Sequence, residues 1–161
     1  MNIAILIEDH FGPQFINHLF ERMKSENIMP ENICLIRSRK YAFCNPKLGN
    51  MVKAAISDSE KVIILIDADG EPIYNKEGAT WRHIRNGRVR EKVRLVSLDY
   101  EIEEWICASL GLQYGNSKPS SVLKHRLKYR KSRLPDYTNK LDFQKLSKSC
   151  ASFRRFLQAL E

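Results

Sequence analysis

The chain has 161 residues, of which 43% are hydrophobic and 29% are charged, and this is enough apolar material for one compact core. No apolar run approaches the length of about 18 residues that marks a membrane span, so we expect no membrane insertion. The N-terminus leads directly into an apolar strand, without a basic lead or a small-residue cleavage site. This pattern favours a soluble cytoplasmic protein.

The cysteines are too widely spaced for a zinc knuckle, because Cys34, Cys44, Cys107 and Cys150 include no C-x-x-C pair. We therefore predict reduced, mostly buried thiols and no structural zinc site.

The net charge of +8 is concentrated in two basic stretches, residues 82–94 and 118–140, which together carry 14 basic and 2 acidic residues. The rest of the chain is mildly acidic. A basic surface on an acidic body indicates a polyanionic partner, and we expect nucleic acid. The residues predicted to contact its phosphates are Arg82, Arg85, Arg88, Lys124, Arg126, Lys128 and Arg130.

Strands and helices alternate along the chain. The first half predicts a strand at 3–7, a helix from Pro13 that ends before Asn27, a strand at 33–36, a helix at 46–57 and a strand at 62–66. The second half predicts a strand at 93–98, a helix at 101–110, a basic and partly helical connection at 115–137, and a final helix at 141–160.

This alternation is typical of parallel strands joined by right-handed crossovers. We therefore predict an α/β three-layer sandwich, Rossmann-like in architecture, with a mainly parallel sheet of about four strands and helices on both faces. The whole chain, 1–161, is expected to form a single domain, with the basic segment 118–140 and the helix 141–160 as its extension.

Carboxylates follow two of the predicted strands. Glu8 and Asp9 come after the first, and Asp67 and Asp69 come after the third. If strand geometry persists to Asp69, the two aspartates point the same way and Glu8 approaches from the neighbouring strand. Converging carboxylates need a proton or a cation, and hard oxygen ligands favour Mg²⁺ or Mn²⁺. Acids that only cap turns or helix N-termini are the alternative.

A second acidic group follows the fourth predicted strand, and we choose Glu103 from it as a further metal ligand. The same acids also fit a first helical turn, where the helix dipole favours negative charge. Asp9 and His10 lie beside the predicted site and are candidate substrate contacts.

The ordered motifs resemble the Toprim (topoisomerase–primase) domain. They are Ile-Leu-Ile-Glu8, Asp67-Ala-Asp69-Gly, Glu101-Ile-Glu-Glu-Trp105 and Ser152-Phe-Arg-Arg-Phe156, and they span most of the chain. The nearest resemblance is to small Toprim-like proteins of unknown function related to the overcoming-lysogenization-defect nucleases. It implies that Glu8 acts as general acid/base or metal ligand. It also implies that Asp67 and Asp69 hold Mg²⁺ for phosphodiester cleavage or nucleotidyl transfer.

The chain departs from the family pattern after the glutamate, where relatives have Gly and this chain has Asp9, with Gly12 further on. The leading prediction is a Mg²⁺-dependent phosphodiesterase or nuclease. A catalytically inactive module that binds nucleic acid or a protein is the second. A receiver-like phosphoacceptor is the third, because Lys118-Pro119 resembles the ending of that fold. Tyr129 and Trp81 either stack on unpaired bases or pack inward.

Overall fold

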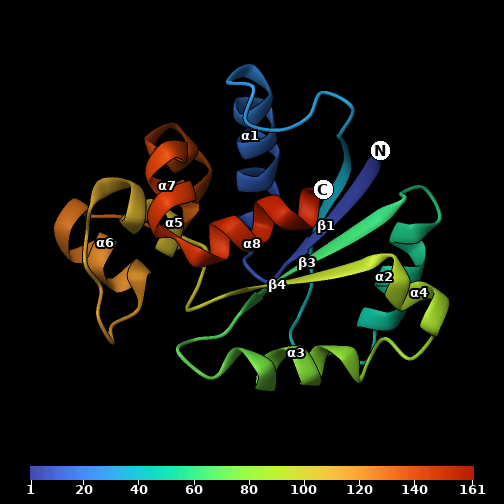
Figure 1. Ribbon diagram of the computed structural model, residues 1–161. Coiled ribbons are helices and arrows are strands. Elements are labelled where there is room, and N and C mark those ends of the chain that lie inside the picture. The colour runs from blue at the N-terminus through green and yellow to red at the C-terminus, as the bar shows by residue number, and fades with distance from the viewer.

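The computed structural model describes residues 1–161 and has one four-stranded sheet with helices on both faces (Figure 1). All strands are parallel and their order is β2-β1-β3-β4. This confirms the predicted α/β three-layer sandwich. The strands are β1 (Asn2–Ile7), β2 (Cys34–Lys40), β3 (Lys61–Asp67) and β4 (Val93–Leu98).

The two central strands are apolar along almost their whole length because helices cover both of their sides. Residues 3–7 of β1 and 62–66 of β3 are all buried. Ile7 is paired with Leu65, so the residues that follow these strands emerge next to one another. The outer strand β2 is longer than predicted and largely polar, since its edge is open to solvent.

The larger core lies between one face of the sheet and most of the helices. It contains Ile5, Ile63 and Trp105 among 29 buried residues. The helices on this side are α1 (Gly12–Ser25), α5 (Glu103–Leu110), α6 (Pro119–Leu127), the 3₁₀ segment η1 (Lys131–Lys140), α7 (Phe143–Ser149) and α8 (Ala151–Leu160).

The smaller core covers the opposite face and contains Leu6, Ile64 and Val52 among 11 buried residues. Its helices are α2 (Leu48–Ile56), α3 (Ile73–Trp81) and α4 (Gly87–Glu91). The sequence analysis missed α3 and α4. Each is short, and α4 has no buried residue, so neither shows a clear apolar stripe.

Two sequence predictions are wrong in detail. The final helix is divided in two at Cys150, whose φ of −110° and ψ of 107° are extended rather than helical. The thiols are not mostly buried, because Cys34 and Cys44 are exposed while Cys107 and Cys150 are buried; all are free. None of the helices is both long enough and apolar enough to span a bilayer.

Candidate functional site at the carboxyl edge of the sheet

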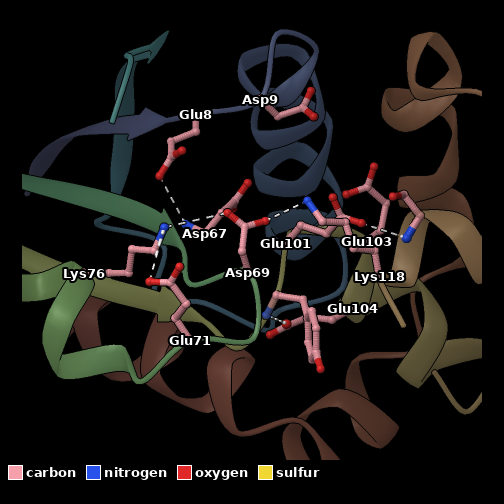
Figure 2. A network of polar contacts seen from close by, with 12 residues as sticks. Glu8, Asp9, Asp67, Asp69, Glu71, Lys76, Glu101, Glu103, Glu104 and Lys118 are labelled. Atoms are coloured by element: carbon pink, nitrogen blue, oxygen red, sulfur yellow. Dashed lines mark hydrogen bonds and ion pairs between the residues drawn. The ribbon is translucent and has the colours of Figure 1, made fainter. Parts of the chain in front are cut away.

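Glu8 and Asp67 lie side by side because Glu8 follows β1 and Asp67 ends the neighbouring parallel strand β3 (Figure 2). The backbone N–H of Asp67 donates to Glu8 Oε1 at 3.3 Å. The buried hydroxyl of Tyr41 lies 3.3 Å from the same oxygen and 3.0 Å from the carbonyl oxygen of Leu65. Tyr41 therefore fixes the Glu8 carboxylate against β3, a role that its position in the sequence did not indicate.

The Asp67 carboxylate makes no hydrogen bond or ion pair with the protein, whereas the backbone N–H of Asp67 is bonded to Glu8. Burial raises the pKa of Asp67 well above its ordinary value, and repulsion from Glu8 and Glu103 raises it further. Burial also raises the pKa of Glu8, against the hydrogen bonds from Asp67 and Tyr41. These carboxylates are therefore poorly compensated by the protein itself.

Asp69 does not follow the strand alternation that would align it with Asp67. The strand ends at Asp67, and Asp69 has a φ of +54° in the left-handed region. Its carboxylate is exposed. It accepts a hydrogen bond of 2.9 Å from Lys118 Nζ and forms a longer ion pair with Lys76 Nζ at 3.8 Å (Figure 2). As exposed ion pairs are weak, a cation could replace Lys118 at small cost.

Lys131 is the centre of a second group of acids beside Asp67. Its Nζ lies 2.9 Å from Asp9 Oδ2, 3.2 Å from Glu103 Oε1 and 3.3 Å from Glu101 Oε2. Although burial opposes it, these carboxylates raise the pKa of Lys131, so the side chain is an ammonium ion. Nothing in the sequence distinguishes Lys131 from the other basic residues around it, and it was missed.

Glu103, the predicted additional ligand, is completely buried at the start of α5. Its Oε1 accepts a hydrogen bond of 2.8 Å from the hydroxyl of Tyr129, and its Oε2 is buried without any partner. Burial and the neighbouring charge of Glu101 raise the pKa of Glu103. Tyr129 packs inward to hold this carboxylate, so it is not available for stacking on bases.

The neighbouring Glu104 has a structural role. Its Oε2 accepts from the N–H of Tyr100 at 2.8 Å and its Oε1 accepts from Ser152 Oγ and, at 3.2 Å, from the N–H of Asp99. Ser152 Oγ also accepts from Trp105 Nε1 at 2.9 Å. Two motifs on which the resemblance rests, around Trp105 and Ser152, thus contact each other and lock α5 to α8.

The basic segment 118–140 adjoins the acidic group, which consists of Asp9, Glu101 and Glu103 around Lys131. A cavity of about 300 Å³ is lined by two serines, three basic side chains and one tyrosine: Ser120, Ser121, Lys124, Tyr129, Arg130 and Lys131. Lys131 belongs to both the cavity and the acidic group. Arg126 and Lys128 are exposed nearby on the same segment, outside this cavity.

The other basic stretch lies away from these acids. Arg82, Arg85 and Arg88 are exposed around α3 and α4, which lead into the amino end of β4 (Figure 1). The acids follow the carboxyl ends of the strands, at the opposite edge of the sheet. The two basic stretches therefore do not form one continuous surface with the acidic group. His10 is exposed beside Phe11, with ring centroids 4.9 Å apart.

No set of three or more His, Cys, Asp or Glu side chains has ready-made metal-binding geometry in this structure. Two of the carboxylates have oxygens that the protein leaves without partners: Glu103 Oε2 is buried without a hydrogen bond, and the Asp67 carboxylate makes no contact of this kind. Mg²⁺ commonly uses only one or two carboxylates and completes its shell with water and phosphate.

Comparison with protein-family models, with curated proteins and with solved structures found no match to this chain.

Proposed function

We propose that this protein is a Mg²⁺- or Mn²⁺-dependent phosphodiesterase that acts on nucleic acid. One observation carries the proposal: half-buried and buried carboxylates with few protein partners lie together at the carboxyl edge of a parallel sheet. Asp67 has no partner for its carboxylate, Glu8 adjoins it, and Glu103 has a free buried oxygen. Open α/β sheets bind their ligands at this edge. The resemblance to Toprim domains agrees with the same residues.

In this proposal Glu8 and Asp67 hold the cation, and Glu103 contributes its free oxygen. Asp69 is a further ligand, provided that it exchanges Lys118 for the metal. A bound divalent cation activates water and stabilises negative charge on a phosphate. Glu8 is also suited to accept a proton, because burial raises its pKa above that of an ordinary glutamate.

The cavity beside the acidic group supplies the complementary chemistry for a phosphodiester. Lys124 and Arg130 project from α6 and the residues after it, and neither takes part in an ion pair within the protein. Two serine hydroxyls line the same cavity. Cations and hydroxyl groups are the usual partners of nucleic-acid phosphates. A substrate held there would place its backbone next to the proposed metal.

The experiment is incubation of labelled single- and double-stranded DNA and RNA with the purified protein in Mg²⁺, Mn²⁺ or EDTA. Asp67→Asn is the test variant. Asp136→Asn is its matched control, because Asp136 is exposed and pairs only with Arg133. We expect cleavage that needs the divalent cation, disappears in Asp67→Asn and survives in Asp136→Asn. Cleavage that persists in EDTA or in Asp67→Asn would refute the proposal.

A nucleic-acid binding module without catalysis is the second candidate. It is favoured because lysines already form ion pairs with several of the carboxylates. Lys131 pairs with Asp9, Glu101 and Glu103, and Lys118 pairs with Asp69. For such a module, we expect wild type and Asp67→Asn to bind the labelled DNA or RNA equally and to cleave neither. That binding would weaken with rising salt concentration, because phosphate contacts release counterions.

A further inference from the structure

Two segments of the chain carry basic residues and no acidic ones, and they meet on the smaller-core side of the sheet. Residues 32–57 contain five lysines and arginines, and residues 78–90 contain four arginines. The segments come together near the start of α2, where a Cβ on Gly49 would lie only 2.6 Å from the backbone carbonyl oxygen of His83. Figure 1 shows α2 and α4 beside each other at this place. Positive charge from distant parts of the sequence is therefore gathered on one surface.

Two cavities of about 370 Å³ and about 240 Å³ flank α2 on this surface. Asn50 lines both of them, so they adjoin each other across the helix. The larger one also has apolar walls, among them Met51, and no carboxylate lines either cavity. We call their basic residues the α2 basic surface: Arg37, Arg39 and Lys47 in the larger cavity, and Lys53, His83 and Arg85 in the smaller one.

The protein leaves most of these cations without a counter-charge. Only Arg37 forms an ion pair, with Asp58. The other lysines and arginines of the surface are exposed and unpaired: Arg39, Lys47, Lys53 and Arg85. Like charges around a shared hollow repel one another, so their arrangement costs stability until an anion enters. A surface that served only solubility would intersperse charges of both signs.

We propose that the α2 basic surface is a second contact for nucleic acid, which holds the phosphate backbone outside the catalytic site. Arginine, lysine and asparagine side chains are usual partners of backbone phosphates. Cations on both sides of α2 suit a row of phosphates, whereas a single small anion would engage only one cavity. The inference rests on the proposed function for the identity of the polyanion, because the substrate proposed there is itself nucleic acid.

This contact is distinct from the cavity beside α6. That cavity lies on the larger-core side of the sheet, and it shares no residue with the two cavities at α2. The two surfaces therefore engage different parts of one substrate. The α2 basic surface contributes to affinity, and the acidic edge of the sheet carries out the chemistry.

The test measures binding of labelled duplex DNA, single-stranded DNA and RNA by fluorescence anisotropy, in EDTA and over a range of salt concentrations. Lys47→Gln/Lys53→Gln removes one charge from each cavity. Lys24→Gln/Lys148→Gln is the matched control, because it removes two exposed lysines from α1 and α7 on the larger-core side. The net charge of both variants is the same.

We expect Lys47→Gln/Lys53→Gln to weaken binding and to reduce the slope of log affinity against log salt. Loss of two phosphate contacts reduces this slope by about 1.8 for a duplex or about 1.4 for a single strand. The control should keep the wild-type slope. Arg39→Gln/Arg85→Gln, which again takes one charge from each cavity, should give the same loss.

Equal slopes in wild type and Lys47→Gln/Lys53→Gln for every probe would overturn the inference, in favour of an acidic protein as the partner of this surface. An equal loss in the control would also overturn it, because the effect would then come from net charge alone. The result is separate from the proposed function, since binding in EDTA can be read for a protein that cleaves nothing. Where cleavage occurs, Lys47→Gln/Lys53→Gln should raise KM and keep the rate at saturating substrate, and a lower saturated rate would contradict a contact outside the catalytic site.

Discussion

The substitution Ser152→Ala tests how α5 is held against α8. The Ser152 hydroxyl accepts from Trp105 Nε1 at 2.9 Å and donates to Glu104 Oε1, and all three residues are buried. Ser152→Ala leaves the indole N–H without a partner, which costs about 1 to 3 kcal/mol. It also removes a hydrogen bond to a carboxylate, worth about 1.5 to 3 kcal/mol when that group is ionised.

The cost of Ser152→Ala should depend on pH, because burial raises the pKa of Glu104 to about 7 from an ordinary value of 4.5. A carboxyl with a raised pKa favours folding below the unfolded value, and this contribution is lost as pH rises toward the folded value. Ser152 lowers the pKa of Glu104, so its removal enlarges that loss. We expect Ser152→Ala to lower the free energy of unfolding by about 2 kcal/mol at pH 5.5 and by about 3 to 4 kcal/mol at pH 8.5.

The assay is urea unfolding followed by circular dichroism at both pH values. Ser149→Ala is the control, because Ser149 is exposed and its hydroxyl donates only to the carbonyl of Lys145. The control should change the free energy of unfolding by less than about 0.5 kcal/mol. A change that small for Ser152→Ala at both pH values would refute the reasoning that this serine joins α5 to α8.

Two further predictions concern packing and the fixing of Glu8. Gly49→Ala should destabilise the protein by about 1 to 3 kcal/mol, because the new Cβ would lie 2.6 Å from the backbone carbonyl oxygen of His83. Gly78→Ala should instead stabilise it by about 0.5 to 1 kcal/mol, because alanine favours the helix α3 and the new Cβ would meet open space. Thermal unfolding of both variants checks this, and destabilisation by Gly78→Ala or none by Gly49→Ala would contradict it. Tyr41→Phe should lower the free energy of unfolding by about 1 kcal/mol and raise the pKa of Glu8, because it removes a hydrogen bond that favours the carboxylate. Nuclear magnetic resonance titration of Glu8 checks the pKa, and an unchanged or lower value would argue against that contact.

Local patterns in the sequence were sufficient to predict the strands of the sheet. Apolar runs predicted all four strands, and they are longest in the central strands β1 and β3, because residues covered on both faces must be apolar. Only the start of β2 was predicted, because the rest of this edge strand is polar. The same patterns failed where burial is one-sided or slight, as in α3 and α4. They also failed at Cys150, where an apolar stripe continues in the sequence although the backbone becomes extended.

The position of Glu8 beside Asp67 could likewise be predicted, because parallel strands end at one edge of a sheet. The conformation of Asp69 could not, since its left-handed backbone depends on the turn that returns toward β4.

The sequence by itself determined the strands, their parallel arrangement and the acids that follow them, because these depend on residue periodicity and on neighbours close in the chain. Only the tertiary structure decided which cation meets which acid. Lys131 lies 122 residues from Asp9 in the chain, yet their side chains are 2.9 Å apart. One lysine among many in a basic segment acquires this position through the packing of η1 against α1 and α5. Periodicity carries no information about such a contact, because it depends on how distant segments fold together.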